Sequence, residues 1–360
     1  MEITTDCNLD CGMCIRHVWQ QPYGNMAEDT FQALIRQLRA IPSVSTVSFS
    51  GFGEPTVHPQ FFYFLEAVKE AGLRAELVTN GLSLAGEAAE RLLDLQLDRL
   101  VVSLDGVASD QDQALHGNSN AVVQSNLNAF YHLRQRRRAS WPEVHLHFVA
   151  TRQNIHELPT LVSRSRQLGV SKIMATNLIP YSPELTDMIL YRRWATPRKN
   201  TGGSPGNPTV SLPRLDAQSE ATAAVEKLCL QGRHVQLGDM DLTGGVMCCR
   251  FVADGCVAVA PDGSVSPCLP LMHSHAYYYQ GQRREIREYR LGNLTEKPLE
   301  QLWNSDEYRG FRRRVRQFEF SPCIDCGGCD LWESNQEDCL GNEFPCCGAC
   351  MWAAGLVQCP

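Results

Sequence analysis

This 360-residue chain lacks the features of a membrane, secreted or nucleic-acid-binding protein. No apolar run approaches the roughly 18 residues that a membrane helix requires. The N-terminus has neither the basic segment nor the apolar segment of a secretory signal peptide. The net charge of −7 argues against a broadly basic surface for nucleic acid. We therefore expect a cytoplasmic protein that binds neither membranes nor nucleic acid.

Local positive charge is also scarce. Basic residues cluster only at Arg134 with residues 136–138, and at residues 312–314 with Arg316. Both clusters fall in helical-looking stretches, so we interpret them as solvated helix faces. Hydrophobic content of 43% and charged content of 20% are typical of a globular protein, and the length predicts about two domains.

Cysteine is absent between Cys14 and Cys229, although the chain contains 16 cysteines. Cysteines that served only as small core residues would scatter along the chain, whereas these are concentrated at its two ends. Stable disulfides are rare in the cytosol. Metal binding is therefore the leading explanation for both groups.

Strand-like and helix-like segments alternate through the first half of the chain. Segments rich in β-branched residues and leucine lie at 45–50, 74–80, 98–105, 143–151 and 172–180, and residues 1–5 are expected to form the first strand. Two intervening segments have apolar residues at helical spacing: Phe31, Leu34, Ile35 and Leu38, then Phe61, Phe64, Leu65 and Val68. This alternation predicts an α/β fold with a parallel sheet.

The composition of the sequence changes in the second half. A Gly/Pro-rich stretch at 196–208 is typical of a surface loop. Residues 209–213, 217–229 and 234–239 could continue the alternation, and one helix is expected near 298–316. From about residue 245 the chain consists of cysteine-rich turns. We predict two domains, residues 1–244 and residues 245–360.

Three cysteines near the start, Cys7, Cys11 and Cys14, have the spacing C-x3-C-x2-C. Cysteines in such short runs hold iron–sulfur clusters. Three thiolates on a four-iron cluster leave one iron open, and an open iron can bind a chelating small molecule. The alternative is a structural zinc site with His17 as the fourth ligand.

These residues resemble the signature of the radical S-adenosylmethionine (SAM) superfamily. The resemblance implies a partial TIM-type parallel (β/α)6 barrel with the cluster at the C-terminal ends of the strands. It implies that the open iron binds the amino nitrogen and carboxylate of SAM. Transfer of one electron would then cleave SAM to a 5′-deoxyadenosyl radical, which abstracts hydrogen from a substrate.

Polar and glycine residues at later strand ends fit the same resemblance. The segment SFSGFGEP at 48–55 is similar to the family's GGEP element, although Phe52 replaces its second glycine. The SAM-binding residues implied are Gly51, Gly53, Glu54, Asn80, Ser103, Asp105, Arg152 and Asn177. Each of them by itself also suits a turn or a cap. Their agreement in order along one barrel favours the SAM site.

The C-terminal cysteines resemble a SPASM domain, an extension of radical SAM enzymes that binds auxiliary 4Fe–4S clusters. Residues 248–268 read as a hairpin with a PDG turn, and Gly263 precedes Cys268 as in the G-x4-C element. The resemblance implies one or two auxiliary clusters, with ligands among Cys249, Cys256, Cys268, Cys323, Cys326, Cys329, Cys339, Cys347, Cys350 and Cys359. Zinc ribbons are the alternative.

The spacing of the last cysteines departs from the family's C-x2-C-x5-C-x3-C pattern. We expect Cys249, Cys256 and Cys268 to share one cluster with a late cysteine. Cys323 and Cys326 would belong to the other cluster. Cys229, Cys248 and Cys346 would then ligate neither cluster.

Residues 11–26 and 337–360 resemble the SPASM proteins that modify the cofactor of tungsten-containing aldehyde ferredoxin oxidoreductases. This resemblance implies maturation of a tungsten cofactor or of its host enzyme, with ferredoxin or flavodoxin as the electron donor. Modification of a peptide or protein is the alternative. A non-enzymatic zinc or iron–sulfur module is the alternative of a different class. The sequence nominates no general acid or base.

Overall fold

The computed structural model describes residues 1–19, 21–107, 120–191, 209–213, 219–230, 234–237, 249–279, 281–321, 323–326 and 329–359. Within these ranges, the side chains of residues 209–212, 219, 226–230, 234–237, 325 and 326 are not described. The predicted loop at 196–208 and the predicted domain boundary near 244 lie outside the described residues. No helix in the described ranges is long and apolar enough to cross a membrane.

A seven-stranded parallel sheet forms the centre of the N-terminal region. Its strands follow chain order: β1 (Thr46–Phe49), β2 (Arg74–Thr79), β3 (Arg99–Ser103), β4 (Glu143–Ala150), β5 (Lys172–Asn177), β6 (Thr209–Leu212) and β7 (His234–Leu237). Every neighbouring pair is parallel. The predicted α/β class is confirmed, and β6 and β7 extend the sheet beyond the last strand of the predicted (β/α)6 barrel. Within the described ranges, no strand pairs β7 with β1.

Residues 1–5 lie at the β1 edge but do not form the regular first strand that we predicted. The amino group of Met1 donates to Ser48 O at 2.7 Å, and Ser50 N donates to Met1 O at 3.0 Å. Glu2 N instead donates to Val259 O at 2.9 Å, and Thr4 forms an isolated bridge with Asn25. Because the partners come from three different segments, no ladder forms.

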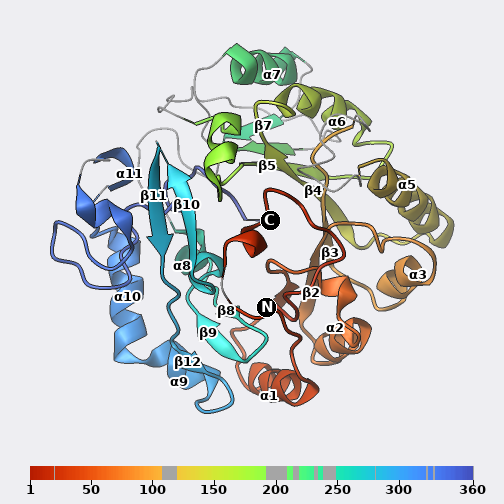
Figure 1. The fold of residues 1–360 in the computed structure, drawn as a ribbon. Coiled ribbons are helices and arrows are strands. Elements are labelled where there is room, and N and C mark those ends of the chain that lie inside the picture. Colours follow the sequence, from red (N-terminus) through yellow and green to blue (C-terminus); the bar gives the residue numbers. More distant parts are fainter. Residues whose placement is uncertain are drawn as a thin grey trace.

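Helices surround this sheet in Figure 1. They are α1 (Glu28–Arg39), α2 (Phe61–Glu70), α3 (Gly86–Asp94), α5 (Asn120–Arg137), α6 (Leu158–Arg164) and α7 (Ser219–Leu230). Short 3₁₀ helices occur at η1 (Ile15–His17), η2 (Pro55–Val57), η3 (Ile155–Glu157), η4 (Pro183–Met188), η5 (Leu269–Leu271) and η6 (Asp330–Glu333). The predicted apolar stripes of α1 and α2 are buried along their whole length.

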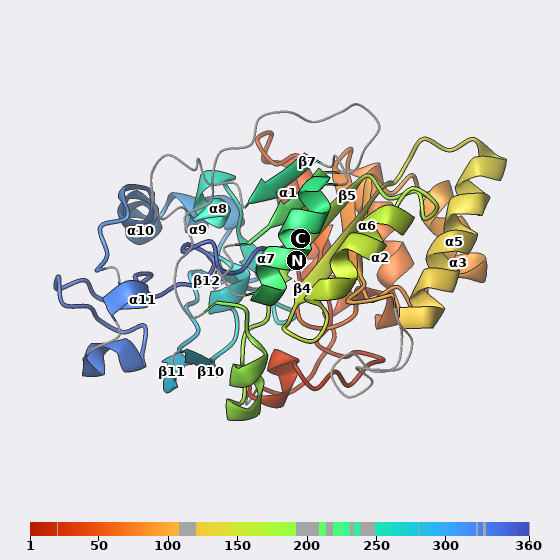
Figure 2. The same cartoon turned by 90° about the horizontal axis from the view of Figure 1, so that it is seen from above.

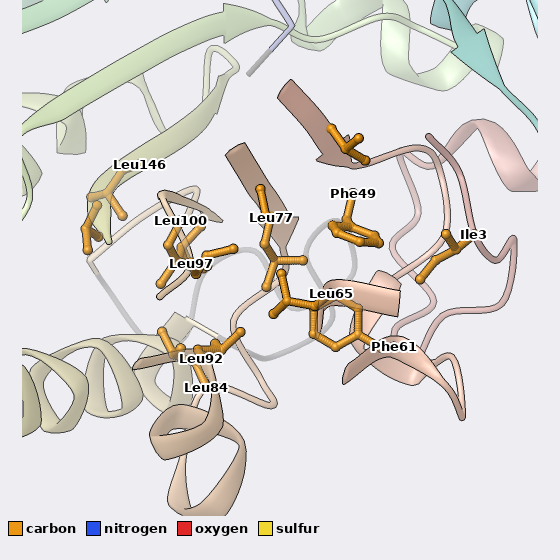
Figure 3. Close-up of a cluster of buried hydrophobic side chains, with 14 of the residues drawn as sticks. Ile3, Phe49, Phe61, Leu65, Leu77, Leu84, Leu92, Leu97, Leu100 and Leu146 are labelled. Atoms are coloured by element: carbon orange, nitrogen blue, oxygen red, sulfur yellow. The ribbon is translucent and has the colours of Figure 1, made fainter. Parts of the chain in front are cut away.

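The core lies between these helices and the strands. Figure 3 shows side chains of β1, β2 and β3 facing those of α2 and α3, including Phe49, Leu77, Leu65 and Leu92. Phe31 of α1 and Phe64 of α2 stack with ring centroids 3.9 Å apart. Alternate residues of β4 are buried against the helices, so the others face the interior of the curved sheet.

The C-terminal region lies beside the barrel edge (Figure 1). It contains α8 (Arg250–Ala253), β8 (Ala258–Val259), β9 (Ser264–Ser266), β10 (His275–Tyr279), β11 (Gln282–Ile286), β12 (Gly292–Asn293), α9 (Leu299–Asn304), α10 (Asp306–Gln317) and α11 (Cys323–Cys326). The predicted hairpin is present as the antiparallel pair β8–β9. The single helix predicted at 298–316 is wrong. Ser305 has extended backbone angles and caps α10 by accepting from Tyr308 N, so the helix is divided there.

The end of the chain returns to the sheet. Asn177 Nδ2 donates to Leu356 O at 2.8 Å, and Gln358 N donates to Thr176 Oγ1 at 2.8 Å. Figures 1 and 2 both place the two chain ends near the centre of the molecule. The last residues therefore form part of the wall beside β5.

We expect Phe64→Ala to lower the free energy of unfolding by about 3–5 kcal/mol, because it removes a fully buried ring from the α1–α2 contact. Tyr63→Ala is the matched control, since Tyr63 is 40% exposed, and should cost about 1 kcal/mol or less. Anaerobic denaturant titration measures both. Equal losses for the two variants would contradict this account of the core.

Candidate active site

Cys7, Cys11 and Cys14 lie on one loop that joins residues 1–6 to η1. Cys14 N donates to Cys11 O at 2.9 Å, and Leu9 N donates to the Cys7 sulfur at 3.4 Å. Burial raises the pKa of Cys11 to about 12, and the charges of Cys14, Asp105 and Cys7 contribute. The three thiols therefore act on one another across a small space, close to the strand ends.

The donor set of this loop fits an iron–sulfur cluster. Cysteine thiolates in short runs of this kind hold such clusters. Cys7, Cys11 and Cys14 would supply three thiolates to a 4Fe–4S cluster.

Gly51 and Gly53 let the loop after β1 press against residues 1–6. A Cβ on Gly53 would lie 2.2 Å from Thr4 O, and one on Gly51 would lie 2.6 Å from the Glu2 side chain. Gly51 also has φ +152°. Only glycine permits this approach. It lets Glu54 N donate to Asp6 O at 2.8 Å, immediately before Cys7.

Glu54 is 2% exposed and links the loop after β1 to the end of β2. One carboxylate oxygen accepts from Thr79 Oγ1 at 2.8 Å and Thr56 Oγ1 at 2.7 Å. The other accepts from Asn80 N at 2.7 Å. Burial raises the pKa of Glu54, while these hydrogen bonds favour its charged form. The carboxylate therefore orders the two neighbouring strand ends.

Asn80 connects the end of β2 to the cysteine loop. Its amide donates to Asn8 Oδ1 at 2.7 Å and lies 3.8 Å from the Cys7 sulfur. Ser103 ends β3 in register with His147 of β4. Asp105 is 8% exposed, accepts from Val149 N at 2.6 Å, and is one of the charges that raise the pKa of Cys11. The structure thus brings Asn80 into contact with the cysteine loop and places Asp105 within electrostatic range of Cys11.

The two remaining predicted SAM-binding residues hold nearby backbone. Arg152 Nε donates to Ile189 O at 3.1 Å, and its own N–H donates to Met188 O at 2.9 Å. Asn177 is 2% exposed and donates to Leu356 O. Direct SAM contacts for these two residues stay predictions.

Two further residues take part in the site: Asn154, which follows the same predicted strand as Arg152, and Tyr181. Asn154 is fully buried, accepts from Thr151 N at 2.7 Å and donates to Asp105 O at 3.0 Å, so it fixes the strand end that carries Asp105. Its place just after β4 was a usable signal. Tyr181 is also buried, and its pKa is raised by burial and by the charges of Cys14 and Cys359. No sequence pattern joins Tyr181 to those cysteines.

Four C-terminal cysteines are brought together from distant segments. Burial raises the pKa of Cys268 well above its usual value, and the charges of Cys249, Cys350 and Cys347 contribute. The pKa of Cys347 is likewise raised, by burial and then by Cys350 and Cys249. Cys359 lies near Cys350 and Cys249, and Trp352 Nε1 donates to its sulfur at 3.0 Å.

A second group lies around Ser321. The Ser321 hydroxyl is 3.0 Å from the Cys339 sulfur and also forms a hydrogen bond with the Cys323 thiol. Cys346, which the sequence analysis left over, lies near both groups. Burial raises its pKa to about 12, Cys323 contributes, and Cys346 in turn acts on Cys347. Cys329 is exposed, and the side chain of Cys326 is outside the description.

Cys256 is not brought to either group. Its residue surface is exposed, and the charges that act on its thiol include those of Asp254 and the amino terminus. The charges that act on Cys268 come instead from Cys249, Cys350 and Cys347. This placement differs from the expected grouping of Cys249, Cys256 and Cys268.

Comparisons with known protein families match two regions of the chain. The model of the radical SAM superfamily matches residues 1–162, and the model of the SPASM iron–sulfur cluster-binding domain matches residues 248–330. This chain is a radical SAM enzyme with a SPASM domain. The predicted family is confirmed, and SAM with 4Fe–4S clusters are the cofactors of that family.

Relatives and solved structures extend the comparison. The tungsten-containing aldehyde ferredoxin oxidoreductase cofactor-modifying protein of Pyrococcus furiosus is 29% identical over 100% of this chain and 96% of its own length. Mycofactocin maturase of Mycobacterium tuberculosis is 23% identical over 95% of this chain and 78% of its own length. Native anSMEcpe with bound AdoMet matches 96% of this chain and 89% of its own, with TM-score 0.56 and 16% identity. Streptococcus suis SuiB with precursor peptide SuiA matches 86% of this chain and 65% of its own, with TM-score 0.58 and 15% identity. The two structures support the fold alone.

We expect Cys268→Ser to remove roughly one cluster's worth of iron from the anaerobically purified protein, because Cys268 lies among three other thiols. Cys256→Ser should retain the wild-type iron content, since Cys256 lies apart. Iron and sulfide analysis of both variants measures the difference. Loss of iron in Cys256→Ser alone would reverse this assignment.

Proposed function

We propose that this enzyme reductively cleaves SAM at the loop of Cys7, Cys11 and Cys14 and uses the product to abstract hydrogen from its substrate. The observation that carries the proposal is the contact of Asn80, at the carboxyl end of β2, with Asn8 and Cys7 on this loop. When bound, the 4Fe–4S cluster supplies the electron that breaks a carbon–sulfur bond of SAM and yields the 5′-deoxyadenosyl radical.

The chain's own residues would order this site before SAM binds. Glu54 fixes the ends of β1 and β2 relative to each other, and Asn80 holds Asn8 and Cys7. Asn154 fixes the backbone of Asp105. Gly51 and Gly53 leave backbone, rather than side chains, facing residues 2–6, which lead into the cysteine loop. SAM would then bind among groups that need little rearrangement, which favours productive orientation.

The C-terminal groups would hold one or two auxiliary clusters. Cys249, Cys268, Cys347 and Cys350 suit one four-thiolate site, with Cys359 beside them. Cys323, Cys339 and Cys346, together with Cys326 and Cys329, offer thiols for a second. An auxiliary cluster with four protein thiolates suits electron relay, since it has no iron left open for a substrate.

We further propose maturation of a tungsten cofactor, or of the oxidoreductase that contains it, as the biological task. Support comes from the Pyrococcus furiosus relative, to which the likeness extends over all of this chain and almost all of that protein. Such a task fits a cytoplasmic enzyme that receives electrons from ferredoxin or flavodoxin. Modification of a peptide is the second candidate, favoured by relatives named mycofactocin maturase and PqqA peptide cyclase.

We expect joint replacement of Cys7, Cys11 and Cys14 by alanine to abolish SAM cleavage, because all three thiolates of the reactive cluster are removed. The auxiliary clusters should remain, since their thiols lie in other segments. Chromatography of 5′-deoxyadenosine formed with dithionite, together with iron analysis, measures both effects. Undiminished cleavage would refute the site, and a colourless wild-type protein containing zinc would favour the non-enzymatic module.

We expect co-expression with a tungsten-containing aldehyde oxidoreductase to raise the specific activity of that oxidoreductase roughly tenfold or more over co-expression with the triple alanine variant. The triple variant serves as the matched control because it differs only at the reactive loop. Equal oxidoreductase activity in both cases would reject the tungsten role. Hydrogen abstraction from a co-expressed small peptide, read by mass spectrometry, would support the second candidate instead.

A further inference from the structure

The outer face of α10 carries positive charge that the proposed function does not use. Arg309, Arg313 and Arg316 are exposed, and their spacing places them on one side of the helix. Together with Arg312 and Gln317 they line a surface groove of about 360 Å³. In the part of the chain that the structure describes, none of these three arginines forms an ion pair, although the chain has a net charge of −7.

Arg312 has a different role from its neighbours. It is 8% exposed, its guanidinium lies 4.1 Å from the Trp303 ring centroid and 4.3 Å from that of Tyr308, and it donates to Trp303 O at 2.7 Å. This residue anchors α10 to α9. The interpretation of the cluster as a solvated face therefore holds for Arg313 and Arg316 but not for Arg312.

The inner face of the same helix covers the C-terminal cysteines. Tyr308, Phe311 and Val315 are buried in one cluster with Cys346, and Cys249 and Cys347 pack against it. A helix is about 10 Å across. The basic groove and the cysteines are thus separated by roughly the thickness of one helix.

Arg314 makes the connection electrostatic as well as steric. Its guanidinium donates to Glu343 O at 3.4 Å. The Cys346 thiol donates to the same Glu343 O at 3.6 Å. Positive charge on α10 therefore reaches the segment that carries this cysteine.

We propose that the basic outer face of α10 docks an acidic one-electron carrier protein, which reduces the cluster held by the cysteines beneath this helix. The proposal rests on the proposed function for the existence of that cluster. The carrier loses one electron and the cluster gains it, and no proton or group is transferred. The groove is open and formed by one helix face, so it suits a complementary protein surface rather than an enclosed small ligand.

The position of α10 in the fold suits this role. Figure 1 shows α10 on the outer side of the C-terminal region, away from the seven-stranded sheet, and Figure 2 agrees. A carrier bound there would leave the strand ends free for the substrate. Opposite charge on the two proteins would also speed their encounter at low ionic strength.

The test is the charge reversal Arg309→Glu, Arg313→Glu, Arg316→Glu in the full-length holoprotein. The probe is an acidic ferredoxin at low salt. We expect its affinity, measured by calorimetry, to fall roughly tenfold or more, and ferredoxin-driven SAM cleavage to fall by a similar factor. Cleavage driven by dithionite, which needs no docking, should be unchanged.

The matched control is Arg36→Glu, Arg39→Glu, Arg136→Glu, which changes the net charge equally at exposed positions of α1 and α5. It should keep the wild-type affinity within about twofold, because its positions lie away from α10. Equal weakening in both triple variants would overturn the proposal. So would a loss of dithionite-driven cleavage in the α10 variant, or an absence of ferredoxin binding by the wild type.

Two further outcomes separate this proposal from others. If the wild type binds ferredoxin through α10 but does not cleave SAM with dithionite, the proposed function fails while the docking surface stands. If a short RNA binds the wild type through the three arginines and ferredoxin does not, the surface serves nucleic acid and the proposal is overturned.

Discussion

The close approach of the loop after β1 to residues 1–6 is the constraint on which the rest of the site depends. A side chain at Gly53 would occupy the position of Thr4 O, so the two backbones touch only because glycine is present. The contact lets Glu54 N donate to Asp6 O, so the cysteine loop begins at the strand ends. The buried Glu54 carboxylate also accepts hydrogen bonds from Thr79 and Asn80, which fixes the end of β2 relative to this loop.

The same N-terminal segment joins the two parts of the molecule. The Glu2 carboxylate is fully buried; it accepts from Phe52 N at 2.7 Å and pairs with His273 at 2.6 Å. Trp19 packs on the His273 ring with centroids 4.3 Å apart. A buried carboxylate–imidazole hydrogen bond of this kind holds one geometry, because either polar group left without its partner would be costly to bury. The SPASM region is therefore fixed to the loop that carries the reactive cysteines.

The C-terminal tail packs against the segment that follows the cysteine loop. Leu356 and Val357 are buried in the same apolar cluster as Ile15 and Trp19, which follow the reactive cysteines along the chain. Tyr181 lies in this cluster, within electrostatic range of both Cys14 and Cys359. The tail thus packs the last residues against the segment that follows Cys14.

The sequence by itself determined the α/β class, the strands β1 to β5, the buried stripes of α1 and α2 and the family, because these depend on local periodicity and on ligand spacing within a few residues. Only the tertiary structure placed Cys249, Cys268, Cys347 and Cys350 within electrostatic range of one another and set Asn154 against the backbone of Asp105. It also divided one apolar stripe into α9 and α10 at Ser305. These outcomes depend on contacts between distant residues, and periodicity along one segment carries no information about which other segment will cover it.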